Sequence, residues 1–184
     1  MTKQQKIAVS ILLIVLTAAT RFLPFSIPNV TPLAAMALFG AAFFKRTTVG
    51  FIFPLVTLYA TNLVLNNTIY RSYYPETGFV WHTSMYVILG FLAISFIGKL
   101  NLKQVTPLKL AVSSLGGSIA FFLISNLSAF FSLAYTKDFQ GLMTCYAAGL
   151  PFFRNAVLGD LFFTTIVFGA YYMVTKDEKV KELA

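Results

Sequence analysis

The chain has 184 residues, of which 58% are hydrophobic and only 11% are charged, and its formal net charge is +8. Ordinary soluble domains contain about 25% charged residues, so this composition excludes a soluble domain, which would have too few polar groups to cover its surface. The apolar runs are long and lack the alternation of barrel strands, which indicates membrane-spanning helices. The single cysteine, Cys145, excludes an internal disulfide and a multi-cysteine metal site.

Six apolar segments follow one another, and we expect each to form a helix: Ile7–Phe22, Thr31–Phe44, Val49–Leu65, Val80–Ile97, Leu108–Leu133 and Pro151–Val174. The second is short and rich in alanine, which favours a tilted or only partly spanning helix. The first could instead be a signal peptide, because a basic start and an apolar core precede Thr17-Ala18-Ala19. We expect it to be retained, because it runs on into Arg21 without a polar break.

These segments predict an all-α polytopic membrane protein. We expect one domain of six transmembrane helices over residues 1–175 and a charged cytoplasmic tail over residues 176–184, which extends the last helix into water.

The sixth segment carries polar residues into apolar surroundings. Residues up to Leu150 are predicted to form a polar link, and Pro151 suits the first turn of the helix that follows. That helix contains Arg154, Asn155 and Asp160. An ionisable residue at membrane depth marks a pathway, a binding site or a buried ion pair.

Asp160 is expected to have a partner from another part of the chain. It lies six residues after Arg154, so on a helix the two side chains point about 120° apart and cannot easily pair. Arg21, near the end of the first segment, is the expected partner, and Arg154 of a neighbouring turn or an asparagine are the alternatives.

The basic residues predict the orientation in the membrane. Ten would lie on one side, namely Lys3, Lys6, Lys45, Arg46, Lys99, Lys103, Lys109, Lys176, Lys179 and Lys181, and four on the other, namely Arg21, Arg71, Lys137 and Arg154. Cytoplasmic links carry the excess of Lys and Arg, so both termini are expected in the cytoplasm. Because these charges are spread through the links, they do not indicate nucleic-acid binding.

Polar side chains gather at the predicted outer end. We single out nine of them as candidate ligand-binding residues: Arg21, Asn29, Asn62, Trp81, Asn126, Tyr146, Arg154, Asn155 and Asp160. Each has a structural alternative, because Trp and Tyr anchor membrane interfaces, asparagines join helices by hydrogen bonds, and Arg and Asp form buried ion pairs. The sequence has no phosphate-binding loop, carboxylate pair, histidine cluster or nucleophile elbow. We therefore expect no enzyme activity, no cofactor and no metal site.

Several motifs resemble a bacterial membrane family of unknown function: Arg21–Pro24 (RFLP), Pro28–Gly40 (PNVTPLAAMALFG), Ser125–Asn126, Cys145–Asn155 (CYAAGLPFFRN) and Gly159–Leu161 (GDL). The resemblance runs from Arg21 to Tyr171. In size and layout the chain is also similar to the S components of energy-coupling-factor vitamin transporters, and more weakly to the solitary cobalamin-binding members. This similarity implies an S-component-like bundle in the bacterial cytoplasmic (inner) membrane, with a ligand near the outer face under the first, third and fifth links.

One feature departs from the S-component pattern. The Ala-xxx-Ala coupling surface expected on the first helix is missing, because Ala8 is followed by Leu12 and Leu16. The spacing occurs instead at Ala37 and Ala41 in the second segment, where it suits close helix packing or a partner helix. The sequence therefore does not decide whether a transporter energising module is a partner.

The expected function is binding and uptake of a small polar or anionic molecule of the vitamin or cofactor-precursor type. Its site would combine charge from arginine, hydrogen bonds from asparagine and stacking on Trp81 and Tyr146. The alternative is a structural subunit or assembly factor of a larger membrane complex. A binder should have an outward cavity with Arg154 on its wall, whereas a structural subunit should have a filled interior and a flat apolar flank.

Overall fold

A computed structural model describes residues 11–12, 15, 18–22, 29–44, 47–75, 78–132 and 134–181. Within these residues the chain is all-helical and has no β-strand, which confirms the predicted class. The elements are the 3-10 helices η1 (Thr20–Phe22) and η2 (Arg71–Tyr73) and the α-helices α2 (Leu33–Phe43), α3 (Thr47–Asn67), α4 (Met85–Asn101), α5 (Pro107–Phe130) and α6 (Phe139–Lys181).

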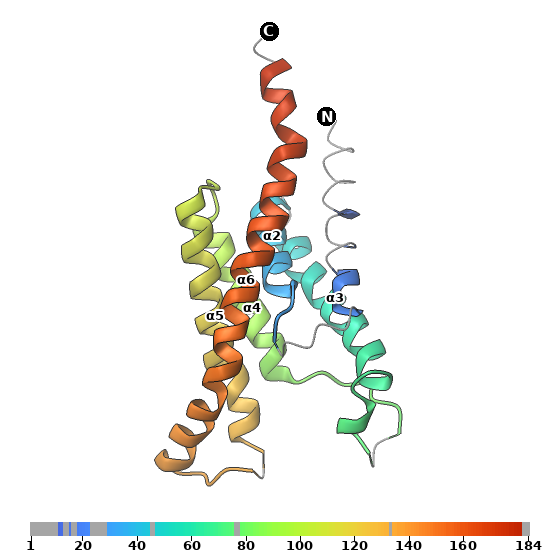
Figure 1. Cartoon of the computed structure of the whole chain (residues 1–184), viewed down its shortest axis with the longest axis vertical. Coiled ribbons are helices and arrows are strands. Elements are labelled where there is room, and N and C mark those ends of the chain that lie inside the picture. The colour runs from blue at the N-terminus through green and yellow to red at the C-terminus, as the bar shows by residue number, and fades with distance from the viewer. Residues whose placement is uncertain are drawn as a thin grey trace.

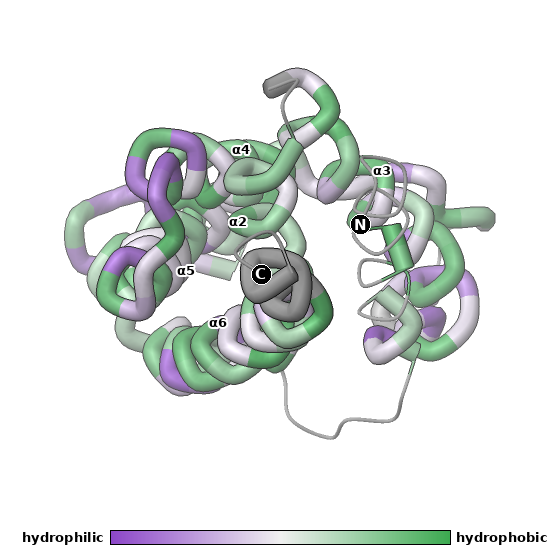
Figure 2. The backbone as a smooth tube through the Cα atoms, turned by 90° about the horizontal axis from the view of Figure 1, so that it is seen from above, coloured by the Kyte–Doolittle hydropathy of each residue, from purple (hydrophilic) through white to green (hydrophobic). Residues whose placement is uncertain are grey.

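Helix α2 is the centre of the bundle. All residues from Leu33 to Ala41 are buried, because the sequence LAAMALFGAAF is apolar on every side and has no face that favours water. Helices α3, α4, α5 and α6 all contact α2 and surround it (Figure 2). With 11 residues, α2 is about 16 Å long and cannot cross a hydrocarbon core of about 30 Å. The expected short second helix is confirmed.

Small residues let α2 approach its neighbours closely. A Cβ atom added to Gly40 would lie 2.8 Å from the carbonyl oxygen of Gly50 in α3, and one added to Gly50 would lie 2.6 Å from the carbonyl oxygen of Gly40. On the α4 side, a Cβ atom on Gly98 would lie 3.1 Å from the Ala41 side chain. Ala37 and Ala41 are both buried, so the Ala-xxx-Ala spacing serves packing inside the bundle and is not an exposed docking surface.

Three of the described helical stretches are long and apolar enough to cross a membrane: Thr48–Asn67, Pro107–Phe130 and Phe139–Val174. Helix α4 is apolar but has only 17 residues. Half of the first predicted segment, eight of its sixteen residues, lies outside the described residues. The structure therefore supports a helical membrane protein, while the count of six spans is not confirmed.

Helix α6 differs from the sequence-based prediction. It begins at Phe139 and runs for 43 residues to Lys181, so the stretch from Cys145 to Leu150 is helical and is not a link. Pro151 lies inside this helix. Proline has no backbone N–H, so Pro151 cannot donate a hydrogen bond to the carbonyl group of Ala147, four residues earlier. The charged tail does continue the helix as expected, at least to Lys181.

The early start of α6 has a local cause at Asp138. Its Oδ1 accepts hydrogen bonds from the Gly141 amide (2.7 Å) and the Thr136 hydroxyl (2.9 Å), and its carbonyl group accepts one from the Leu142 amide (3.0 Å). A carboxylate in this position satisfies an amide of the first helical turn. The Gly141 amide, followed by the Thr136 hydroxyl, lowers the pKa of the Asp138 carboxyl from its usual value of 3.8.

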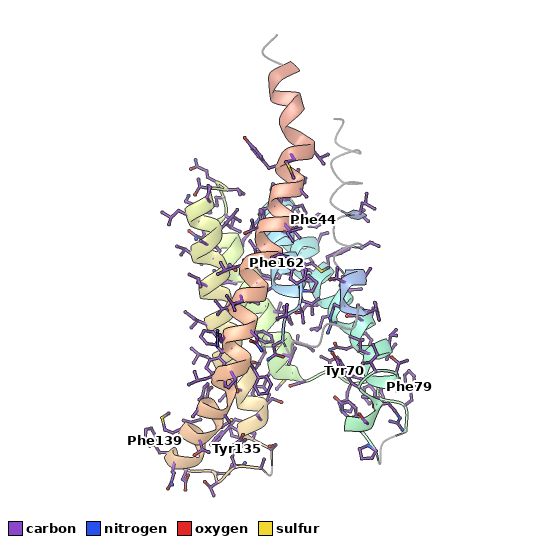
Figure 3. The ribbon with its side chains drawn as sticks, in the orientation of Figure 1. Phe44, Tyr70, Phe79, Tyr135, Phe139 and Phe162 are labelled. Atoms are coloured by element: carbon purple, nitrogen blue, oxygen red, sulfur yellow. The ribbon has the colours of Figure 1, made fainter. Side chains whose placement is uncertain are left out.

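The links alternate between the two ends of the bundle. The α3–α4 and α5–α6 links lie at the lower end in Figure 1, whereas the α4–α5 link and the C-terminal part of α6 lie at the upper end. Aromatic side chains accompany the lower links, with Tyr70 and Phe79 at one and Tyr135 and Phe139 at the other (Figure 3). Aromatic residues are enriched where a membrane protein meets the headgroups, so this end has the composition of an interface.

Candidate functional site

A cavity of about 210 Å³ lies inside the bundle, and we call it the central cavity. Its apolar walls come from α2, α3, α4, α5 and α6. Its polar lining consists of Arg21, Asn29, Thr31, Asn62 and Asp160. Four of these five residues are among the nine that the sequence predicted, so folding brings them together from η1, the segment before α2, α3 and α6.

Arg21 is fixed on the α3 side of the central cavity. Its Nη1 donates a hydrogen bond to the Thr61 hydroxyl, and its Nη2 donates one to Asn62 Oδ1 at 3.0 Å. Asn62 is oriented in turn, because its Nδ2 contacts the Thr83 hydroxyl at 3.4 Å. Thr61 and Asn62 are neutral, so they hold the guanidinium in place without neutralising its charge.

Asp160 lies on the other side, where α6 packs against α5. Its Oδ2 accepts a hydrogen bond of 2.6 Å from the Ser118 hydroxyl, and the residue is only 6% exposed. Gly159 allows this position, because a Cβ atom there would lie 3.1 Å from the Cα atom of Val30. The missing side chain lets α6 approach the segment that leads into α2, and Asp160 then faces the cavity.

The expected Arg21–Asp160 ion pair is therefore wrong. Both residues line the central cavity, but their hydrogen bonds go to α3 and to α5, and no ion pair joins them. The physical reason is the breadth of the bundle, because α3 and α6 pack on different sides of α2 (Figure 2). The cavity separates the two opposite charges.

A second cavity of about 150 Å³ lies next to the first, between α5 and α6. The two cavities share Asn29, Phe121 and Ala156 in their linings. Asn126 lines the second cavity, and its Nδ2 donates a hydrogen bond of 2.8 Å to the Phe122 carbonyl group. Polar space thus continues from the central cavity along the interface of α5 and α6.

Asn29 connects the two cavities to the surface. It is an exposed residue that lines both of them. Its φ angle is 64°, and among the described non-glycine residues it alone has a positive φ. Asparagine is several-fold enriched in this left-handed region. The backbone at Asn29 turns the chain into α2 and leaves its side chain at the mouth of the cavities.

Four predicted residues lie away from both cavities. Trp81 is 69% exposed and packs edge-to-face with His82. The Tyr146 hydroxyl donates a hydrogen bond of 2.5 Å to the Leu123 carbonyl group. Arg154 is exposed and Asn155 is half-buried, and neither lines the cavities. The expectation that Arg154 stands on the cavity wall is wrong, because it points about 120° away from Asp160 around α6.

Sequence reasoning missed Ser118 and Thr61, the two hydroxyl groups that bind the charged residues. Thr61 precedes Asn62 directly, and that adjacency was the available signal. Ser118 looks like any small residue of a packed helix, and only its place four residues after Ser114 on an otherwise apolar face sets it apart.

Cys145 is buried at the interface of α5 and α6, and its thiol lies 3.6 Å from the Asn126 carbonyl oxygen. In the described part of the chain no three His, Cys, Asp or Glu side chains are placed to hold a metal ion.

Comparison with known proteins identifies one family. The model of the family of unknown function DUF6580 matches residues 1–183, so the chain belongs to this family. No curated protein and no solved structure matches it. The expected membership of a family of unknown function is thus confirmed. Because the family has no assigned chemistry, the function must be argued from the cavities.

Proposed function

We propose that this DUF6580 protein binds a small polar molecule in the central cavity and takes part in its uptake across the membrane. One observation carries the proposal: a guanidinium and a carboxylate line the same cavity without pairing with each other. Removing charges from water is unfavourable unless partners replace the water. A polar molecule between Arg21 and Asp160 would supply partners to both.

The remaining lining fits this role. Small-molecule sites are mostly apolar, with a few polar groups that set the orientation of the ligand. The central cavity has apolar side chains such as Leu58, Val87 and Phe91 around its polar residues. Its volume favours the smallest members of the vitamin or cofactor-precursor class.

The location is part of the proposal. The ten-to-four division of basic residues supports cytoplasmic termini and a ligand that enters from the end with the α3–α4 and α5–α6 links. We propose a bacterial cytoplasmic membrane as the location, on the resemblance of the sequence to S components in size and layout alone. An energising module, if one couples to this protein, would need a surface other than Ala37 and Ala41, which are buried.

Mass spectrometry of small molecules that co-purify with the protein tests the proposal. Ala156 lines both cavities, so Ala156→Leu should narrow both of them and abolish the co-purifying molecule. Ala148→Leu is the matched control, because Ala148 is an exposed residue of the same helix. The proposal fails if the wild-type protein carries no molecule, or if both variants retain it equally.

The alternative, a structural subunit of a larger complex, is favoured by a different feature. An apolar groove of about 570 Å³ lies between the start of α5 and the C-terminal half of α6, and Leu110 and Phe168 line it. If this groove holds a partner helix, Leu110→Trp should reduce the size of the complex on native gels, whereas Ala156→Leu should not.

A further inference from the structure

We infer that the ligand of the central cavity is a compact zwitterion of the α-amino-acid class, with its carboxylate at Arg21 and its ammonium group at Asp160. The inference rests on the proposed function, because it names the chemical class of the molecule bound there. It follows from the charges, the free hydrogen-bonding groups and the size of the cavity.

Arg21 offers a prepared site for a carboxylate. A guanidinium has five N–H donors in a planar fork, and two of them bind Thr61 and Asn62. The other three donors have no hydrogen-bond partner in the described part of the chain, and the two bonds to α3 fix the plane in which they point. Arginine binds carboxylates through paired N–H groups of this kind.

Asp160 offers the complementary site for an ammonium group. A carboxylate has about four acceptor positions on its two oxygens, and Ser118 uses one of them on Oδ2. Because Asp160 lines the cavity, its remaining acceptor positions are available there. An ammonium group has donors only and can bind this carboxylate directly.

A ligand with a single charge would fit less well. An anion at Arg21 would leave the Asp160 carboxylate buried with only a hydroxyl partner, and a cation at Asp160 would leave the guanidinium with only neutral partners. An uncompensated buried charge is strongly unfavourable. A molecule that carries both charges leaves neither group without a counter-charge, and it matches a cavity whose lining has one positive and one negative residue.

The size and the apolar wall define the rest of the ligand. The volume of about 210 Å³ corresponds to about seven water molecules at their liquid density. The rings of Phe91 and Phe121, with centroids 4.9 Å apart, form one wall. A small apolar side chain would contact these rings, so amino acids between alanine and leucine in size fit best.

Three related compounds test the inference on the full-length protein in detergent: L-leucine, N-acetyl-L-leucine, which lacks the ammonium group, and L-leucine amide, which lacks the carboxylate. Calorimetric titration should show binding of L-leucine and at least about tenfold weaker binding of both derivatives. Arg21→Gln should abolish binding of L-leucine. Arg154→Gln is the matched control and should leave it unchanged, because Arg154 lies outside the cavity.

The outcomes separate this inference from the proposed function. If N-acetyl-L-leucine or L-leucine amide binds as tightly as L-leucine, the ligand needs one charge only and the inference is overturned while the cavity remains a binding site. If none of the three binds but another molecule co-purifies and Ala156→Leu removes it, the inference is again overturned. If none of the three compounds binds and no molecule co-purifies, the proposed function is overturned as well. The wild-type titrations decide these cases even if Arg21→Gln does not fold.

Discussion

The hydrogen bond between Ser118 and Asp160 is expected to contribute strongly to the stability of the α5–α6 pair. The two residues are 2% and 6% exposed, and their oxygens are 2.6 Å apart. A hydrogen bond to a charged group contributes about 1.5–3 kcal/mol. Ser118→Ala should therefore lower the free energy of unfolding by about that amount, because the carboxylate keeps its burial and loses its partner.

A matched control lies one turn earlier on the same helix. Ser114 is also 2% exposed, but its hydroxyl has no hydrogen-bond partner among the described residues. Ser114→Ala removes the same atom without breaking a bond, so the free energy of unfolding should stay the same or rise. The Ser118 hydroxyl also lies within hydrogen-bond distance of the Ser114 carbonyl oxygen (3.0 Å). The difference between the two variants therefore separates the hydrogen bonds of the Ser118 hydroxyl from the general effect of replacing serine by alanine in α5.

Asp160→Asn completes the comparison as a double-mutant cycle with Ser118→Ala. Asparagine keeps the shape and an acceptor oxygen but removes the buried charge, so the single variant should be as stable as the wild-type protein or more stable. Loss of the hydroxyl should then matter less in the asparagine background. Reversible unfolding in mixed micelles measures all four proteins, and equal effects of Ser118→Ala and Ser114→Ala would refute the reasoning.

Three further outcomes are expected. Gly50→Ala should destabilise the protein by separating α2 from α3, because its Cβ atom would lie 2.6 Å from the Gly40 carbonyl oxygen. Gly169→Ala should be tolerated, because its added Cβ would meet no described atom within 4 Å beyond the adjacent turns of its own helix. Thermal unfolding of both variants tests this. The pKa of the Asp138 carboxyl is lowered in the folded protein. The charged carboxyl therefore stabilises the fold at a pH above its unfolded pKa, and this stabilisation is lost as the pH falls through its folded pKa. Unfolding of Asp138→Asn, followed as a function of pH, should lack this part of the acid dependence. Reporter fusions at Lys45–Arg46 should report the cytoplasm, and an external signal there would reverse the proposed orientation.

Much of the site could be predicted because charged and amide side chains are rare in apolar segments. Arg21, Asn62 and Asp160 stand out in such surroundings on composition alone, and Asn29 stands out in the turn before α2. The structure brings all four to one cavity. The short α2 was also predictable, because its apolar run ends well before it could cross a membrane.

The partners of these residues could not be predicted in the same way. Whether two side chains on different helices pair depends on the rotation of each helix about its own axis and on the depth in the membrane at which the helices meet. The spacing of residues along one segment gives neither of these. Arg21 and Asp160 were therefore matched by charge, whereas the bundle places the hydroxyl groups of Thr61 and Ser118 next to them. The direction of Arg154 could not be predicted either, because an angle of about 120° from Asp160 around the helix shows that the two side chains do not share a face but does not show which of them faces the cavity.

The sequence predicts the start of α6 too far along the chain, because Pro151 is a stronger signal for a helix start than Asp138. A proline suits the first turn of a helix, but it is tolerated inside a membrane helix when its surroundings satisfy the freed carbonyl group. The Asp138 cap, with Gly141 three residues later, marks the true start. It also makes the α5–α6 link shorter than the sequence suggested.

An experimental density map of the purified protein in lipid nanodiscs tests the central claim most directly. It should show the Arg21 guanidinium bound to Thr61 and Asn62, the Asp160 carboxylate bound to Ser118, and density from a bound molecule between them. A map in which Arg21 and Asp160 form an ion pair and the cavity between them is closed would contradict the account.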